Sequence, residues 1–108
     1  KELSHFLEQR IRQRGFVPLE DFCGHGIGRS PHEEPQILNY LECPNPKQGP
    51  KMREGMVFCI EPMICCAAGK PVVLEDGWSV TSQDGRNGSH YEHTVAIVNG
   101  KARILTHA

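Results

Sequence analysis

The feature that most constrains the fold is one helical segment followed by a long series of short β-type segments. Leu3, Leu7 and Ile11 recur at helical spacing, and Gly15 stands where a glycine commonly ends a helix. All 8 prolines follow this segment, with most of the 11 glycines, and they divide the rest of the chain into short runs. One helix followed by many strands predicts an α+β fold with a mostly antiparallel sheet.

Strands are expected where apolar runs end at turn residues. Residues 16–23 are expected to form an edge strand, because Pro18 has no N–H to donate to a ladder. Residues 56–66 are apolar apart from Glu61 and Pro62, which predicts a buried strand that ends at Pro62. The remaining expected elements are strands at 71–77, 78–82, 90–98 and 102–106, turns at 76–77 and 83–89, and a loop at 42–55.

Charge and hydropathy exclude several classes of partner. The chain has 12 Lys and Arg against 13 Asp and Glu, a net charge of −1 with neutral histidines. This balance gives no reason to expect nucleic acid or an anionic membrane surface as a partner. No apolar run approaches the roughly 20 residues of a membrane span, and no secretory signal is visible at the start. We therefore expect neither a nucleic acid nor a membrane partner.

The five cysteines indicate a reducing compartment. Their number is odd, no two have the CxxC spacing, and the adjacent Cys65 and Cys66 are poor partners for each other. Such a pattern predicts free thiols rather than a disulfide framework or a zinc–cysteine site. A cytoplasmic location is the expectation that follows.

Two glutamates stand at the ends of apolar strands. Glu61 follows the run MVFCI, and Glu92 precedes the run TVAIV. A buried carboxylate is costly unless it is paired or bound to a metal. Within one strand, His90 and Glu92 would share a face while His93 points to the other face. Each glutamate could instead simply mark the solvent end of its strand.

A glycine-rich stretch, GHGIGRSPHEEP, carries two histidines. Gly24 and Gly26 flank His25, and glycine lets a backbone approach a ligand closely or turn with positive φ. A histidine held in this way suits metal binding or acid–base chemistry, although it could equally be part of a polar loop. His32 could be a second ligand, a substrate contact or a surface residue. The glycine spacing does not match the GxGxxG dinucleotide fingerprint.

Taken together, His25, Glu61 and Glu92 predict a divalent metal site at strand ends. Imidazole and carboxylate ligands suit Mn, Fe, Co or Zn. Two carboxylates can also bridge two ions about 3.5–4 Å apart, as in hydrolytic two-metal sites. We therefore expect divalent metal ions as cofactors.

Four motifs follow one another along the chain: GHGIGRSPHEEPQILNY, MVFCIEPMI, DGWSV and YEHTVAIV. Their order and spacing resemble those of the type I methionine aminopeptidases, over nearly all of the 108 residues. The resemblance implies part of the pita-bread fold and a dinuclear metal centre. It also implies an enzyme that removes the initiator methionine, with the N-terminus of a nascent protein or peptide as its substrate.

The resemblance also implies roles for individual residues. His25 matches a histidine metal ligand, and Glu92 matches the glutamate that bridges the metals. Glu61 matches a metal ligand that also serves in proton transfer. His32 matches a catalytic histidine that contacts the substrate, and Trp78 matches an aromatic residue near the methionine side-chain pocket.

The chain departs from the family pattern in two ways. Pro31 stands where the family usually has an aromatic residue that lines the methionine pocket. The family's catalytic domain is also about twice as long, and its first half supplies two aspartate ligands and another catalytic histidine. The resemblance therefore implies that residues 1–108 are the C-terminal half of that domain, without its N-terminal half.

Half a site has physical consequences. Two divalent ions carry four positive charges, whereas Glu61 and Glu92 supply only two negative ones. We therefore expect weak binding of a single ion by His25 and the two glutamates, with an open position left for water. Half a fold also exposes strand edges, which favour pairing with another chain. The expected partner is the missing N-terminal half or a second copy in a homodimer.

Other functions remain open from the sequence alone. The chain could be inactive by itself, as a truncated piece of the enzyme. It could also be a non-catalytic pita-bread binding module, although such relatives usually lose the metal ligands. A prolidase-like peptidase of the same fold is a further alternative, which the HEEPQ and DGW motifs disfavour.

Overall fold

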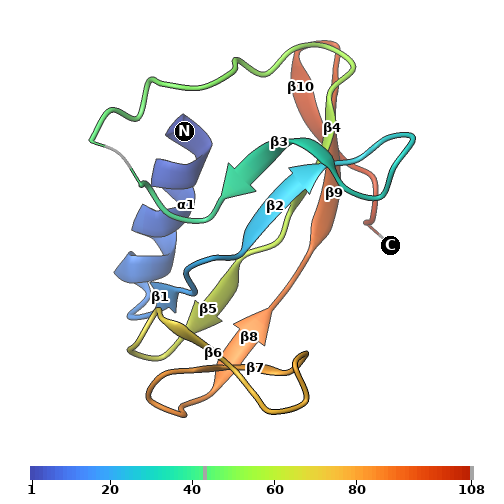
Figure 1. The fold of residues 1–108 in the computed structure, drawn as a ribbon. Coiled ribbons are helices and arrows are strands. Elements are labelled where there is room, and N and C mark those ends of the chain that lie inside the picture. The colour runs from blue at the N-terminus through green and yellow to red at the C-terminus, as the bar shows by residue number, and fades with distance from the viewer. Residues whose placement is uncertain (43, 108) are drawn as a thin grey trace.

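One helix and ten strands make up the fold, in a computed structural model that describes residues 1–42 and 44–107 (Figure 1). The predicted α+β class with antiparallel sheets is confirmed. The helix is α1 (Glu2–Gln13). The strands are β1 (Val17–Pro18), β2 (Cys23–Gly26), β3 (Glu33–Leu38), β4 (Val57–Ile60), β5 (Met63–Cys65), β6 (Pro71–Val73), β7 (Val80–Ser82), β8 (Gly88–His90), β9 (His93–Val98) and β10 (Lys101–Ile104).

Helix α1 ends as the sequence predicts. Gly15 has a φ of +80°, the left-handed conformation that glycine adopts without a steric penalty. Its N–H donates to the carbonyl of Arg12, so an otherwise unpaired carbonyl of the last turn is satisfied. Glu2 in the first turn and Arg10 in the last turn both suit the helix dipole.

The strands form three antiparallel sheets. The largest has five strands in the order β10-β9-β4-β2-β3, the second has three in the order β1-β5-β8, and β6 pairs with β7. The β6–β7 hairpin confirms the predicted turn at residues 76–77. In Figure 1 this hairpin lies at the end of the molecule opposite to β10.

Two neighbouring strands pass together from the five-stranded to the three-stranded sheet. β4 leads into β5 and β8 leads into β9, each through two residues outside the strands. Ile60 pairs with His93 on one side of this junction, and Met63 pairs with His90 on the other. The register is the same on both sides, so the two linking segments lie opposite each other.

The five-stranded sheet has two different faces, because alternate side chains along a strand point in opposite directions. The first, which we call the helix face, carries the buried side chains of Phe58, Val95 and Ile97. Leu3 of α1 packs against this cluster, as do the partly buried Ile37, Met56 and Ile60. The opposite face, which we call the site face, carries Cys59 and Thr94 on the same two central strands.

The strands predicted at 71–77, 78–82 and 102–106 are shorter or shifted, at 71–73, 80–82 and 101–104, and three other predictions were wrong in larger ways. Residues 16–23 form two strands rather than one, since Asp21 turns the chain with a φ of 65°. The strand at 56–66 does stop before Pro62, but the chain pairs again as β5, in another sheet. The strand at 90–98 is likewise interrupted, at Tyr91 and Glu92, and β8 begins inside the predicted turn at 83–89. β3 was not predicted.

Candidate metal centre

Two glutamates face each other at the junction of the two sheets. The register that pairs Ile60 with His93 places Glu61 opposite Glu92. Both residues lie on the same side of the chain as Cys59 and Thr94, so they continue the site face. Glu61 is only 9% exposed, whereas Glu92 is open to solvent. Like charges directly opposite each other on adjacent strands are destabilising. A cation between the two carboxylates would remove this penalty.

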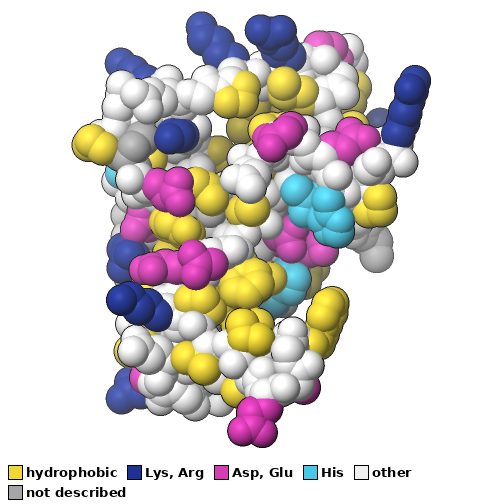
Figure 2. Space-filling view, viewed as in Figure 1, with side chains coloured by type: hydrophobic (Ala, Val, Ile, Leu, Met, Phe, Trp, Pro, Cys, Tyr) yellow, Lys and Arg dark blue, Asp and Glu magenta, His cyan; other side chains and the backbone are white. Residues whose placement is uncertain are grey.

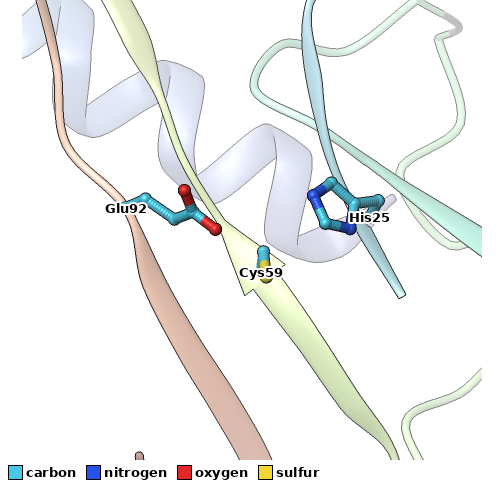
Figure 3. Close-up of side chains that lie close together, drawn as sticks. All are labelled: His25, Cys59 and Glu92. Carbon is cyan, nitrogen blue, oxygen red and sulfur yellow. The ribbon is translucent and has the colours of Figure 1, made fainter. Parts of the chain in front are cut away.

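Strand β2 brings a histidine to the same place. Gly26 pairs with Phe58 of β4, which sets His25 beside Cys59 on the neighbouring strand (Figure 3). The imidazole Nε2 of His25 lies 3.1 Å from Oε1 of Glu61. The side chains of His25 and Glu61 are 16% and 11% exposed, so they meet in a largely buried position.

The glycines around His25 are needed for close approach of the strands. A Cβ at Gly24 would overlap the carbonyl oxygen of Cys59, and a Cβ at Gly26 would overlap the carbonyl oxygen of Glu34. Both neighbours are main-chain atoms, so neither can move aside cheaply. The sequence predicted a close approach to a ligand or a positive φ, but neither glycine has a positive φ, and both instead allow close approach to the main chain of neighbouring strands.

The hydrogen bonds of His25 leave its second nitrogen available to a metal. Nδ1 of His25 lies 2.9 Å from the carbonyl oxygen of Gly26. Because a carbonyl can only accept, we assign the ring proton to Nδ1, which makes Nε2 of the neutral ring an acceptor. Nε2 faces Oε1 of Glu61, a buried oxygen with no hydrogen-bond donor among the described residues. A metal ion would satisfy both acceptors.

The spacing of these atoms suits ligands of one ion. Two ligands each about 2.1 Å from an ion are about 3 Å apart when they subtend a right angle. The Nε2–Oε1 distance of 3.1 Å matches that spacing. Ligand atoms of His25, Cys59 and Glu92 lie within 4.8 Å of one another, as do those of Glu61, His90 and Glu92. The predicted ligands are thus divided between two groups that share Glu92, with His25 in one and Glu61 in the other, and the contact between His25 and Glu61 joins the two groups.

Cys59 lies in this cluster but is a poor ligand. Burial raises the pKa of its thiol, and so do the neighbouring carboxylates of Glu92 and Glu61. The thiol is therefore protonated near neutral pH, whereas metals bind the thiolate. Its Sγ lies 3.5 Å from the hydroxyl of Thr94 instead. The sequence did not single out Cys59, although its position two residues before Glu61 puts both on one face.

His90 is the second cluster residue that was not named as part of the site. Its Nε2 lies 3.4 Å from Oε2 of Glu61. The sequence placed His90 on the same face as Glu92 and His93 on the other. That prediction is confirmed, since His90 joins the cluster while Nδ1 of His93 contacts the hydroxyl of Thr106 at 2.8 Å.

His32 lies against the predicted ligand His25. The two rings meet edge to face, with 4.3 Å between their centroids. Both rings line a groove of about 480 Å³, together with Cys23, Glu33, Glu34 and Gln36. Oε1 of Glu33 accepts the N–H of Ser30 at 2.8 Å, which ties down the loop that carries His32. An exposed histidine beside a groove is well placed to contact a substrate. Figure 2 shows histidine side chains beside acidic ones on this side of the molecule.

Trp78 is not brought into the cluster. It lies in the turn between β6 and β7 and is 88% exposed. Asp76 holds this turn, because its Oδ1 accepts the N–H groups of Trp78 and Ser79 at 3.0 and 2.8 Å. The predicted role of Trp78 beside the methionine side chain remains a prediction.

Two expectations about the environment of the chain concern thiols and membranes. Cys23, Cys59, Cys65 and Cys66 are free, as predicted, while Cys43 lies outside the described residues. Within residues 1–42 and 44–107, no helix has the length and apolar character needed to cross a membrane.

This chain was compared with family models, with known sequences and with solved structures, and the three comparisons agree. The model of metallopeptidase family M24 matches residues 1–99. The methionine aminopeptidase of Helicobacter pylori strain 26695 is 64% identical over 107 residues, which are 98% of this chain and 42% of that protein. The methionine aminopeptidase of Clostridium perfringens is 42% identical over 105 residues, with 97% and 41% covered.

Solved structures of methionine aminopeptidases superpose closely on this chain. The methionine aminopeptidase of Thermotoga maritima superposes with a TM-score of 0.89 at 41% identity, over 97% of this chain and 41% of that one. The enzyme of Rickettsia prowazekii gives a TM-score of 0.83 at 33% identity, over 92% and 39%. The predicted resemblance to these enzymes and the predicted partial pita-bread fold are both confirmed. The chain spans about two fifths of the length of the curated relatives it matches.

Proposed function

We propose, since this chain belongs to metallopeptidase family M24, that it supplies metal-binding residues to an aminopeptidase that removes N-terminal methionine from nascent proteins. The observation that carries the proposal is the buried Oε1 of Glu61, which faces Nε2 of His25 without a donor. The opposed carboxylate of Glu92 adds the negative charge that a divalent ion requires. His25, Glu61 and Glu92 are the proposed ligands.

The proposed cofactor is a divalent ion of the Mn, Fe, Co or Zn type, which imidazole and carboxylate ligands suit. When bound, such an ion polarises a carbonyl and makes water a stronger nucleophile near neutral pH. The chain's own residues do the rest. His25 and Glu92 hold charge and orientation at the site, and the carboxylate of Glu61 carries a proton from the attacking water towards the leaving amine.

Substrate contacts are proposed for two further residues. His32 would donate or accept a hydrogen bond at the scissile peptide, since its ring packs on His25 at the edge of the groove. Trp78 would cover the methionine side chain, because its exposed ring offers an apolar surface for this contact. Pro31 beside His32 leaves the methionine pocket without an aromatic wall on that side.

The remaining ligands are proposed to come from outside these 108 residues. Residues 1–108 would form the C-terminal half of the catalytic domain, and the coverage of 42% of the Helicobacter pylori relative supports a partial domain. The N-terminal half would add two aspartates and complete a two-metal site, whereas a homodimer would not place aspartates there. The cytoplasm is the proposed location, in keeping with the free thiols and with the bacterial relatives.

A chimera tests this function most directly. The 107 matched residues of the Helicobacter pylori enzyme are replaced by this chain, and methionine release from a Met-Ala-Ser peptide is measured with added Mn²⁺ or Co²⁺. The chimera is expected to release methionine, while this chain alone is not. Glu61→Ala is expected to lower the rate at least about 100-fold, because a proton carrier and a ligand are lost together.

The matched control is Glu75→Ala, which removes a carboxylate from an exposed turn and is expected to leave the rate unchanged. A chimera with native circular dichroism that releases no methionine would favour a non-catalytic binding module. Equal rates for the Glu61 and Glu75 variants would contradict the proposed chemistry.

A further inference from the structure

We propose that His90 is a positioning residue that holds the carboxylate of Glu61 in the orientation needed to bind the metal. The inference rests on the proposed function and adds a residue to its site. Glu61 has a neighbour for each of its oxygens, and the two neighbours come from different sheets. His25 of β2 lies 3.1 Å from Oε1, and His90 of β8 lies 3.4 Å from Oε2.

The two oxygens of Glu61 have different surroundings. Oε1 is buried without a donor and faces the acceptor nitrogen of His25, which is the arrangement of two ligands waiting for a cation. Oε2 faces the imidazole of His90 instead. When one oxygen binds a metal, the other needs a hydrogen-bond donor to keep the carboxylate from rotating. His90 is the side chain placed to be that donor.

The backbone around His90 is fixed by strand pairing. β8 pairs with β5 through Met63 and His90, Ile64 and Ser89, and Cys65 and Gly88. The pair Met63–His90 is the last before the junction, so His90 sits at the point where Glu61 leaves the sheet. Pro62, between Glu61 and Met63, has a fixed φ and further limits movement of the glutamate.

The position of His90 favours positioning over direct ligation, because it faces Oε2 of Glu61 and not the Oε1 that faces His25. Its side chain is 44% exposed, against 16% for His25 and 11% for Glu61. The proposed metal position lies beside Oε1 of Glu61, towards His25, whereas His90 lies on the side of Oε2. An imidazole on that side can hold Oε2 without displacing the ligands on the other.

Titration of the purified 108-residue chain with Co²⁺ tests the proposal. Affinity is measured by calorimetry, and the visible d–d absorption of bound Co²⁺ reports on its ligands. His90→Ala is expected to weaken binding about 10- to 100-fold, as loss of a residue that orients a ligand does. The absorption band keeps its wild-type shape, since the ligands are unchanged. His90→Gln, which keeps an N–H donor, is expected to recover most of the affinity.

Two further variants make the outcomes separable. His107→Ala removes an exposed histidine far along the chain and is expected to change nothing, while His25→Ala is expected to abolish binding. Binding that needs His25 but not His90 overturns this inference and leaves the proposed function standing. A changed band that His90→Gln does not restore makes His90 a ligand and also overturns it. Binding that is absent, or indifferent to His25, counts against the metal centre itself.

Discussion

The two faces of the five-stranded sheet differ in chemistry: the helix face carries the apolar core, and the site face carries the polar side chains of the candidate metal centre. On the helix face, Phe58, Val95 and Ile97 are buried together under a contact from α1. On the site face, Glu61 and Glu92, just beyond the ends of β4 and β9, lie near each other and near the imidazole of His25 on β2. Burial of the apolar group stabilises the fold, whereas burial of Glu61 costs free energy until a cation is bound.

The difference teaches where stability and function separate in this chain. A period of two residues is enough to divide β4 into a core side and a chemical side. The division persists through the junction to the second sheet, because the register between β4–β5 and β8–β9 does not shift. Substitutions on the two faces should therefore affect different measurements.

The largest effect on stability is expected from the helix face. Phe58→Ala removes a side chain that is 3% exposed and leaves a cavity against Val95 and Ile97, which should cost about 3–5 kcal/mol of unfolding free energy. Urea denaturation followed by circular dichroism measures this loss. The control is Val98→Ala, at a position that is 38% exposed. Similar losses for the two variants would mean that the core is elsewhere.

The next largest effect is expected from a metal on the site face. Co²⁺ at 100 times its dissociation constant should add about 2.7 kcal/mol to the unfolding free energy, provided that it binds only the folded chain. Glu61→Gln should remove this increment. In the presence of a chelator the same variant should lose little stability or gain some, because it ends the repulsion with Glu92. Paired urea denaturations with Co²⁺ and with EDTA measure both effects, and a large loss in EDTA would contradict the account.

A substitution in β2 should affect both the unfolding free energy and the affinity for Co²⁺. Gly24→Ala places a methyl group on the carbonyl oxygen of Cys59, so β2 must move away from β4. The expected cost is about 1–3 kcal/mol of unfolding free energy, together with weaker Co²⁺ binding as His25 moves with its strand. Gly88→Ala is the control. Its methyl group would lie 3.1 Å from the carbonyl oxygen of Ile64, a much milder contact than the overlap at Gly24, so a smaller loss of unfolding free energy is expected. Wild-type Co²⁺ affinity in Gly24→Ala would show that the close approach is not needed.

The smallest effect is expected at the β9–β10 turn, outside both faces. The N–H groups of Gly100 and Asn99 donate to the carboxylate of Glu54 and lower the pKa of this fully exposed group. A lowered folded-state pKa gives stability that is present above the unfolded pKa of about 4.3 and is lost as pH falls through the folded value. Glu54→Gln should therefore narrow its difference from wild type as pH falls below 4. A gap that widens in acid would reverse the predicted sign.

Much of this architecture could be predicted from local patterns. The helical spacing of Leu3, Leu7 and Ile11 located α1, and alternation placed His90 and Glu92 on one face. Gly24 and Gly26 indicated a close approach of the backbone, although the approach is to the main chain of β4 and β3 and not to a ligand. Each of these signals depends on residues near one another in the sequence, where the physical rule acts directly.

The errors arose where pairing between distant segments decides the outcome. The run 56–66 is apolar apart from Glu61 and Pro62, and the run 90–98 is polar at its start, but neither composition shows that the chain changes sheets. Distant segments decide the change, since the two runs pair with each other on both sides of the junction while β2 pairs with β4 and β1 pairs with β5. Cys59 and His90 were missed as members of the cluster for the same reason, since their neighbours come from other strands.

The central claim is that the site face holds a metal ion through His25, Glu61 and Glu92. Equilibrium dialysis of the 108-residue chain against Co²⁺, with metal analysis of the protein, tests it most directly. The account predicts weak binding of one ion per chain, abolished by His25→Ala and by Glu61→Gln. Binding that survives both substitutions, or the absence of binding at millimolar Co²⁺, would contradict it.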